Sequence, residues 1–387
     1  MVEKFLKKSF EKVINLLDNN QLKNGHNGPY RDKETNVREI SHLLVFYSNI
    51  IKSNIYTDNS KIKGQLIKLK DALINNENYR GEAYFKFRIK PGKDEVNGVI
   101  GVAWVLEGLC ASYEVLKDKE ILVFLEKIIS SIKFNSKRSL WERPTLIFSD
   151  ESGVDETYNH QLWLAYGLVY YAKISSSEIL PEVKLFFEKT DSHLNIHKNG
   201  LIVHALRNKN GFKNKLKTFL KQMKIFVSTM KNSTSTKYKE EGYHMFSMYA
   251  FARISYLGFE SLFNTSIKFQ KSLKYLTKEE LYIGLSSNAE SSDYYSITPP
   301  SGLIYNRYGF PYNVSGFEFL YVNEIFNLKK EVLSKKYLKS QLDVYGFDVK
   351  TEKFDNNVKT EDITNLFLRV YELSFYICIR RFQVKNN

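Results

Sequence analysis

Acidic side chains recur at equal intervals along this sequence, each time just before a stretch with helical periodicity. Glu34, Glu95 and Glu156 follow one another at intervals of 61 residues, and a fourth acidic pair ends at Glu241. Carboxylates can serve as general acid and base, and His or Tyr can move a proton in a reaction. The residues of this kind that cluster at these points are the candidate catalytic residues Asp94, Asp155, His160, Tyr243 and His244.

Equal spacing of this kind indicates a structural repeat. Two helices with their loops fill an interval of this length, so the repeated unit is predicted to be a helical hairpin. Acidic residues also cap helices wherever helices begin, which would explain the acids but not their equal spacing. Helices are predicted at 2–19, 36–54, 60–76, 97–117, 119–134, 157–174, 177–191, 210–231, 242–256, 259–278 and 362–382.

About six such hairpins predict an all-α fold, an (α/α)6 toroid formed by residues 1–387 as a single domain. An open solenoid would need polar end caps, whereas both ends of this sequence are amphipathic. A short inner element is expected at 200–204, and strand-like alternation is limited to 84–89 and 303–308. The segment at about 285–316 is expected to cover one end of the ring, and helix 362–382 to close it.

Parallel inner helices would bring all their first turns to one mouth of the ring. The polar and aromatic side chains gathered there are typical of a sugar pocket, in which rings stack on the sugar and polar groups bind its hydroxyls. Arg38 could pair with a substrate carboxylate or, equally, with Glu34 one turn earlier. The predicted substrate-binding residues are Arg38, His42, Asn97, Trp104, Asn159, Trp163, Glu241 and, from a loop, Glu318.

The stretches 92–98 (GKDEVNG) and 155–163 (DETYNHQLW) resemble those of (α/α)6 carbohydrate-active enzymes, particularly unsaturated glucuronyl hydrolases. The likeness extends to helical proteins of surface-polysaccharide gene clusters. It implies a hydrolase acting on an acidic, uronate-containing saccharide, in which Asp155 is the general acid and Asp94 stabilises the developing positive charge. Against this role, a helix N-terminus lowers the pKa of a carboxyl group, so Asp155 would need desolvation to keep its proton.

Two alternatives remain open. His160, Tyr243 and His244 resemble the residues with which polysaccharide lyases and uronate C5-epimerases move the C5 proton, while an Asn such as Asn159 neutralises the carboxylate. A histidine among aromatic residues is, however, more often a hydrogen-bonded core residue. The third possibility is a non-catalytic protein that binds sugar or serves as a scaffold in polysaccharide synthesis.

Composition excludes several other classes. The net charge of +14 comes mostly from lysines spread along the chain, whereas nucleic-acid binders concentrate charge on one face. Such a positive field suits an acidic saccharide. Two cysteines cannot form a disulfide framework. No secretory signal or membrane span is expected, so a cytoplasmic location is predicted. The spacing of His193, His197 and His204 predicts no metal site, no cofactor motif is present, and the oligomeric state is open.

Overall fold

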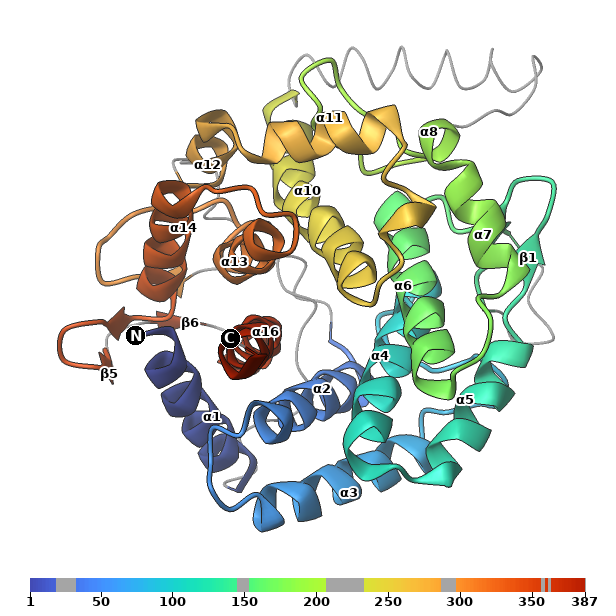
Figure 1. Ribbon diagram of the computed structural model, residues 1–387, viewed down its shortest axis with the longest axis horizontal. Coiled ribbons are helices and arrows are strands. Elements are labelled where there is room, and N and C mark those ends of the chain that lie inside the picture. The colour runs from blue at the N-terminus through green and yellow to red at the C-terminus, as the bar shows by residue number, and fades with distance from the viewer. Residues whose placement is uncertain are drawn as a thin grey trace.

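Two concentric rings of helices form the molecule (Figure 1). The structure is a computed structural model that describes residues 1–18, 33–144, 153–206, 233–286, 297–355, 359–360 and 363–386. Six helices form the inner ring, and each packs against the next until the last contacts the first. In chain order they are α2 (Val37–Ser53), α4 (Gly98–Leu116), α6 (Tyr158–Ser175), α10 (Ser233–Tyr256), α13 (Ser315–Ile325) and α16 (Tyr371–Asn386).

The outer ring alternates with the inner one along the chain, as the hairpin repeat predicts. Its members are α1 (Val2–Asp18), α3 (Ser60–Ile74), α5 (Lys119–Ser130), α7 with α8 (Pro181–Glu188, Thr190–His193), α11 with α12 (Ile267–Leu276, Glu279–Ser286) and α14 (Glu331–Val344). Two short helices, η2 (Glu260–Leu262) and α15 (Ile363–Leu368), complete the described helices.

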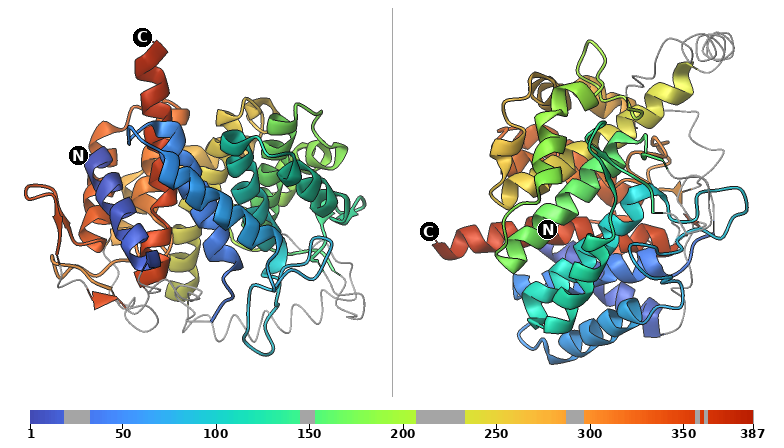
Figure 2. Two further views of the ribbon diagram at one scale, coloured as in Figure 1. Left: turned by 90° about the horizontal axis from the view of Figure 1, so that it is seen from below. Right: turned by 90° about the vertical axis from the view of Figure 1, so that its right-hand side faces the viewer.

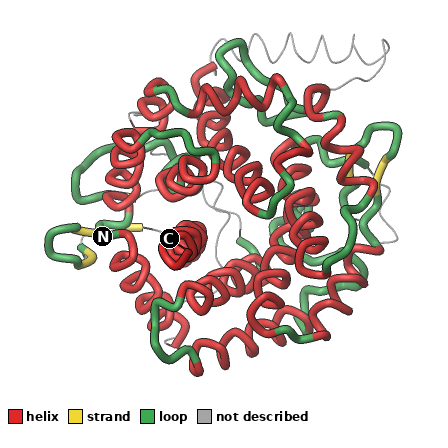
Figure 3. The backbone as a smooth tube through the Cα atoms, viewed as in Figure 1, coloured by secondary structure: helices red, strands yellow, loops and turns green. Residues whose placement is uncertain are grey.

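Three two-stranded antiparallel sheets lie in the connections of the described chain. β1 (Phe134–Asn135) pairs with β2 (Leu140–Trp141), β3 (Ile297–Thr298) with β6 (Lys359–Thr360), and β4 (Phe347–Asp348) with β5 (Lys353–Phe354). Figure 3 shows how little strand the rings contain. Most backbone hydrogen bonding in the described chain is therefore internal to single helices, and the fold depends on how helices pack side by side.

Burial separates the two rings. Outer helices such as α1 and α5 are amphipathic, with one buried face, whereas α4 is buried on all sides over its first fifteen residues, Gly98 to Ser112. By length and hydropathy α4 could cross a bilayer, contrary to the expectation of no such segment, but 78% of its apolar window is buried inside the ring. An inner helix surrounded by neighbours needs apolar residues on every face.

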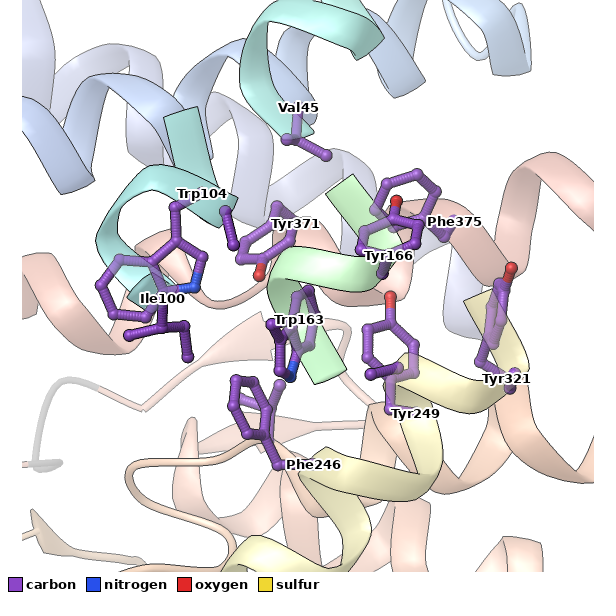
Figure 4. Close-up of a cluster of buried hydrophobic side chains, with 14 of the residues drawn as sticks. Val45, Ile100, Trp104, Trp163, Tyr166, Phe246, Tyr249, Tyr321, Tyr371 and Phe375 are labelled. Carbon is purple, nitrogen blue, oxygen red and sulfur yellow. The ribbon is translucent and has the colours of Figure 1, made fainter. Parts of the chain in front are cut away.

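Close approach between the first two inner helices depends on one glycine. A Cβ atom at Gly108 of α4 would lie 2.7 Å from the carbonyl oxygen of Ser41 on α2. Larger residues there would force the helices apart. The centre of the ring is filled by aromatic side chains (Figure 4), including Trp163, Tyr166 and Phe246 from α6 and α10.

The structure corrects several of the predicted elements. Residues 315–325 and 331–344 form α13 and α14, where the sequence analysis placed Glu318 in a loop and predicted no helix between 278 and 362. The 259–278 helix is divided into η2 and α11, and residues 200–204, expected as a short inner element, form an extended turn. Residues 84–89 form only isolated bridges, and 303–308 are not a strand. The 210–231 helix lies outside the described residues.

We expect Gly108→Ala to lower the free energy of unfolding by about 1–3 kcal/mol, because the added methyl group meets the α2 backbone. Gly64, on the solvent-facing side of α3, is a matched control, since nothing lies within 4 Å of its Cβ position. Gly64→Ala should raise stability by about 0.5–1 kcal/mol through helix propensity. Urea unfolding of both variants checks this, and equal effects of the same sign would contradict the close-approach explanation.

Candidate active site

The first turns of the inner helices lie at one end of the ring, opposite the end from which α16 projects (Figure 2). Asp94 and Asp155 meet there, as predicted, although they are far apart in sequence. Asp94 accepts hydrogen bonds from the backbone N–H groups of Val96 and Gly98 (3.1 and 2.6 Å), and Asp155 accepts one from the next N–H, that of Val99 (3.0 Å). Both carboxylates therefore cap the N-terminus of α4, where free N–H groups and the helix dipole favour negative charge.

Asp155 also holds a histidine. Its Oδ2 atom lies 2.8 Å from Nδ1 of His160, and its Oδ1 atom accepts from the N–H of Thr157 at 3.0 Å. Burial tends to raise the pKa of Asp155, but His160 and the backbone donors outweigh it and lower the pKa to about 2. A carboxylate ionised at neutral pH cannot act as a general acid, so the role predicted for Asp155 does not fit its environment. It fits the role of orienting His160.

The backbone at the start of α4 is shaped for this contact. Asn97 and Gly98 both adopt left-handed conformations, with φ of +58° and +61°. A Cβ at Gly98 would lie only 2.0 Å from Oδ2 of Asp155 and 2.7 Å from Nδ1 of His160. Only glycine leaves room for the carboxylate and the imidazole together. Asn97 is buried at the same point but makes no capping hydrogen bond through its side chain.

His160 lies near His204 and the aromatic rings that contact it. Its side chain retains 20% of its exposure, and it acts electrostatically on His204, a residue of the extended turn before the undescribed segment. His204 packs against Tyr243 of α10 with 4.6 Å between ring centroids and the rings tilted by 31°, and Tyr243 in turn contacts Tyr312 edge-on at 6.5 Å. Burial, together with Lys239 and His160, lowers the pKa of His204 to about 3, so His204 is neutral at physiological pH.

On the side of the mouth formed by α2 and α4, Arg38 and Trp104 pack against each other. Arg38 lies over Trp104 of α4, with its guanidinium carbon 4.6 Å from the ring centroid, and 5.7 Å from that of Tyr312. Arg38 also pairs with Glu34 at 3.4 Å, as the sequence analysis allowed. His42 packs edge-on against Trp104, and burial followed by the nearby charges of Arg38 and Arg369 holds its pKa well below the usual value.

Asn159 and Trp163, four residues apart on α6, share one face of the helix. Trp163 stacks on Phe246 of α10 at 4.6 Å and lies in the aromatic centre of the ring (Figure 4). The Asn159 side chain is buried, yet neither its oxygen nor its nitrogen has a hydrogen-bond partner among the described residues. Buried amide groups are rarely left in that state. Asn159 is therefore suited to hydrogen bonding with a ligand.

A buried charged network from α13 and the start of α16 lies next to these residues, and most of it was not predicted from the sequence. Arg369, just before α16, pairs with Glu372 at 2.6 Å and with Glu318 of α13 at 3.5 Å. Burial, then the adjacent Glu372 carboxylate, raises the pKa of Glu318 well above its ordinary value. Glu318 is thus a buried helical residue and does not reach the mouth from a loop.

Two predicted site residues face away from the mouth. His244 accepts the N–H of Ile202 at Nδ1 and lies 3.2 Å from the Ser272 carbonyl oxygen at Nε2, so it bridges to the outer ring. Glu241 packs against Gly284 of α12 and pairs with Lys237 at 3.6 Å. On a helix, neighbours in sequence point about 100° apart, and of the predicted cluster at 241–244 only Tyr243 points to the mouth.

His204, Tyr312 and Arg369 belong to the mouth but were not predicted there. Their sequence signal is weak: His204 lies in a turn without helical periodicity, Tyr312 in a connection, and Arg369 inside the predicted helix 362–382, which was expected only to close the ring. Among the described residues, no group of three or more His, Cys, Asp or Glu side chains could hold a metal ion.

Solved structures with the same architecture are carbohydrate-active enzymes. A cellobiose 2-epimerase from Bacillus thermoamylovorans superposes with a TM-score of 0.59 at 11% identity, over 98% of this chain and 99% of that one. A GH76 α-mannanase from Bacteroides thetaiotaomicron gives 0.53 at 10% identity, over 100% and 98%. A family 88 glycosyl hydrolase from Bacteroides vulgatus gives 0.52 at 8% identity, over 98% and 99%. The chain therefore has the (α/α)6 toroid fold found in these enzymes, which confirms the predicted fold class.

One curated relative is similar in sequence as well. The chain is 26% identical over 360 residues to Archaeal glycosylation protein Q of Haloferax volcanii, covering 90% of each sequence. No protein-family model matches the chain. The fold class and this likeness together associate the chain with carbohydrate metabolism, without fixing a reaction.

The capping role of Asp155 has a measurable pH dependence. Because its pKa is lowered from 3.8 to about 2 in the folded protein, it stabilises the fold by about 2 kcal/mol above pH 4. This contribution is lost as the pH falls towards 2, where both states become protonated. We expect Asp155→Asn to be less stable than the wild type at pH 7 and to approach it at pH 2–3. Urea unfolding across this range measures it, and a pH-independent difference would contradict the assignment.

Proposed function

We propose that the protein is a saccharide-processing enzyme that moves a proton on its substrate by histidine acid/base chemistry, as an epimerase or a lyase does. The observation that supports it is the Asp155–His160 pair at the mouth of the ring. A carboxylate bound to Nδ1 fixes the tautomer and stabilises the imidazolium that forms when Nε2 accepts a proton.

The reaction would begin at a carbon next to a carbonyl or carboxylate group. Nε2 of His160 takes the proton, and the electron pair of the broken C–H bond moves onto the adjacent oxygen as an enolate. Asn159, whose amide has no partner among the described residues, can donate to that oxygen. Donors placed where negative charge develops are a large contribution to catalysis.

The enolate then has two outcomes. Return of a proton to the opposite face by the phenol of Tyr243, which packs against His204, would invert the carbon and give an epimer. Loss of a leaving group from the neighbouring carbon gives a new C=C bond, as in a lyase.

A hydrolase using Asp94 and Asp155 is less well supported. Both carboxylates are occupied by N–H groups at the start of α4, and the low pKa of Asp155 leaves no proton to donate to a glycosidic oxygen. The net charge of +14 favours an acidic saccharide as the substrate, and so do the two cations at the mouth, Arg38 over Trp104 and Lys239 over Tyr243. The relative named for archaeal glycosylation is consistent with such a role.

Deuterium exchange tests the proposal. We expect the wild type, incubated with a panel of uronate-containing oligosaccharides in D2O, to introduce deuterium at a sugar carbon, detected by NMR. His160→Gln should lower this rate about 10²- to 10⁴-fold, the usual contribution of a general base. A lyase would also yield a product that absorbs in the ultraviolet.

His197→Gln is the matched control, because His197 also contacts a carboxylate, Glu240 at 2.7 Å, but its side chain is 50% exposed. It should exchange at the wild-type rate. Release of sugar that requires Asp94 and proceeds in His160→Gln would support the hydrolase instead. Neither exchange nor cleavage by the wild type would overturn the proposal in favour of a binding protein.

A further inference from the structure

We propose that α2, α4 and the start of α16 together form a subsite for one anionic group of the substrate, a carboxylate or a phosphate. The inference deepens the proposed function and rests on it in one respect, that the ligand is a saccharide. It adds Arg369 to the predicted substrate-binding residues Arg38, His42 and Trp104, and it assigns the four to an anionic group.

Unpartnered hydrogen-bond donors indicate the subsite. Nη2 of Arg38, Nε of Arg369 and Nε1 of Trp104 are all buried, and none has a hydrogen-bond partner among the described residues. Leaving a buried donor unsatisfied is costly, and most so for a charged one. Three such donors in one place indicate a ligand that supplies acceptors.

These donors belong to a single cluster of contacts. Arg38 lies over Trp104 at 4.6 Å, and His42 packs edge-on against Trp104 at 5.4 Å. His42 also packs against Tyr371 of α16, with ring centroids 4.6 Å apart, and Arg369 lies 6.0 Å from the centroid of that tyrosine ring. The two arginines both depress the pKa of His42, after burial, so both charges reach the same imidazole.

The types of unpaired atom specify the ligand group. An arginine or tryptophan N–H can only donate, so the complementary group must accept at several points and need not donate. Ionised carboxylate and phosphate have this property. The buried acceptors nearby that also lack a hydrogen-bond partner in the described chain, the oxygens of Glu318 and Glu372, lie against Nη2 of Arg369, so the N–H groups of Arg38 and Trp104 are the donors that most need an outside acceptor. Nε2 of His42, also without a partner in the described chain, can join as a fourth donor, since the neutral ring can carry its proton there.

The ion pairs that the two arginines already make do not use all of their N–H groups. Arg38 contacts Glu34 through Nη1 at 3.4 Å, and its Nη2 is not part of this ion pair. Arg369 contacts Glu372 through Nη2, which leaves Nε. By contrast, Asn159 on α6 offers one donor and one acceptor, the pattern that suits a hydroxyl or carbonyl group. The two sides of the mouth therefore select different groups.

Equilibrium binding tests the subsite independently of turnover. With His160→Gln as background, calorimetry would compare D-glucuronate, its uncharged methyl ester and glucose 1-phosphate. We expect at least one of the two anions to bind more tightly than the ester. Trp104→Phe, which removes one N–H and keeps an aromatic ring, should weaken that anion about tenfold or more and the ester little. Whichever anion binds identifies the source of the charge.

Trp163→Phe provides the control, since it removes another buried, unpartnered indole N–H from a different inner helix. It should affect the anion and the ester alike. The proposal is overturned if the ester binds as tightly as both anions, if neither anion binds, or if Trp104→Phe weakens anion and ester equally. Because His160 is already replaced, these outcomes are separate from the exchange experiment: exchange without anion preference would retain the proton transfer and reject only the subsite.

Discussion

The capping of α4 by Asp155 is the interaction on which the mouth depends. This carboxylate comes from the connection ahead of α6, yet it completes the first turn of α4, the inner helix of the previous hairpin. The same oxygen contacts His160, so the position of the histidine is tied to the N-terminus of its neighbour. The Asp155 carboxylate thus caps a helix, joins two hairpins and orients an imidazole. A side chain at position 98 would collide with this carboxylate, and glycine avoids the collision.

Different inner helices contribute different kinds of side chain to the mouth. α6 provides His160 and the Asn159 amide, which has no partner in the part of the chain that the structure describes. α10 and the 297–314 connection provide tyrosine rings, and α2, α4 and the start of α16 provide the cationic side. Each inner helix contributes only a few side chains, and no single hairpin contains a complete set. Function in such a fold is located in the set of first turns, while the rest of each inner helix serves to hold those turns at fixed separation.

Much of this could be predicted from the sequence, for identifiable reasons. Equal spacing located the first three inner helices and brought Asp94 and Asp155 together, because capping acids mark helix starts wherever the repeat is regular. α13 and α14 were missed because no such marker precedes α13 and its start is rich in residues typical of loops. The direction of the His244 side chain could not be predicted. An error of one residue in the predicted start of a helix turns each side chain by about 100°, which is enough to move it from the mouth to the outer ring. His204 and Arg369 reach the site through tertiary packing, which no local pattern reports.

Closure by α16 has a consequence for how the protein folds. Arg369 and Tyr371, which complete the cationic side, follow the other five inner helices along the chain, and α16 packs between α13 and α2. Until α16 docks, the first five hairpins form an open arc, whose free edges expose apolar surface normally covered by Phe375 and its neighbours. Exposed surface of this kind is what chaperones and proteases recognise. A chain in which α16 has not yet docked would therefore lack the cationic side and expose apolar surface at the same time.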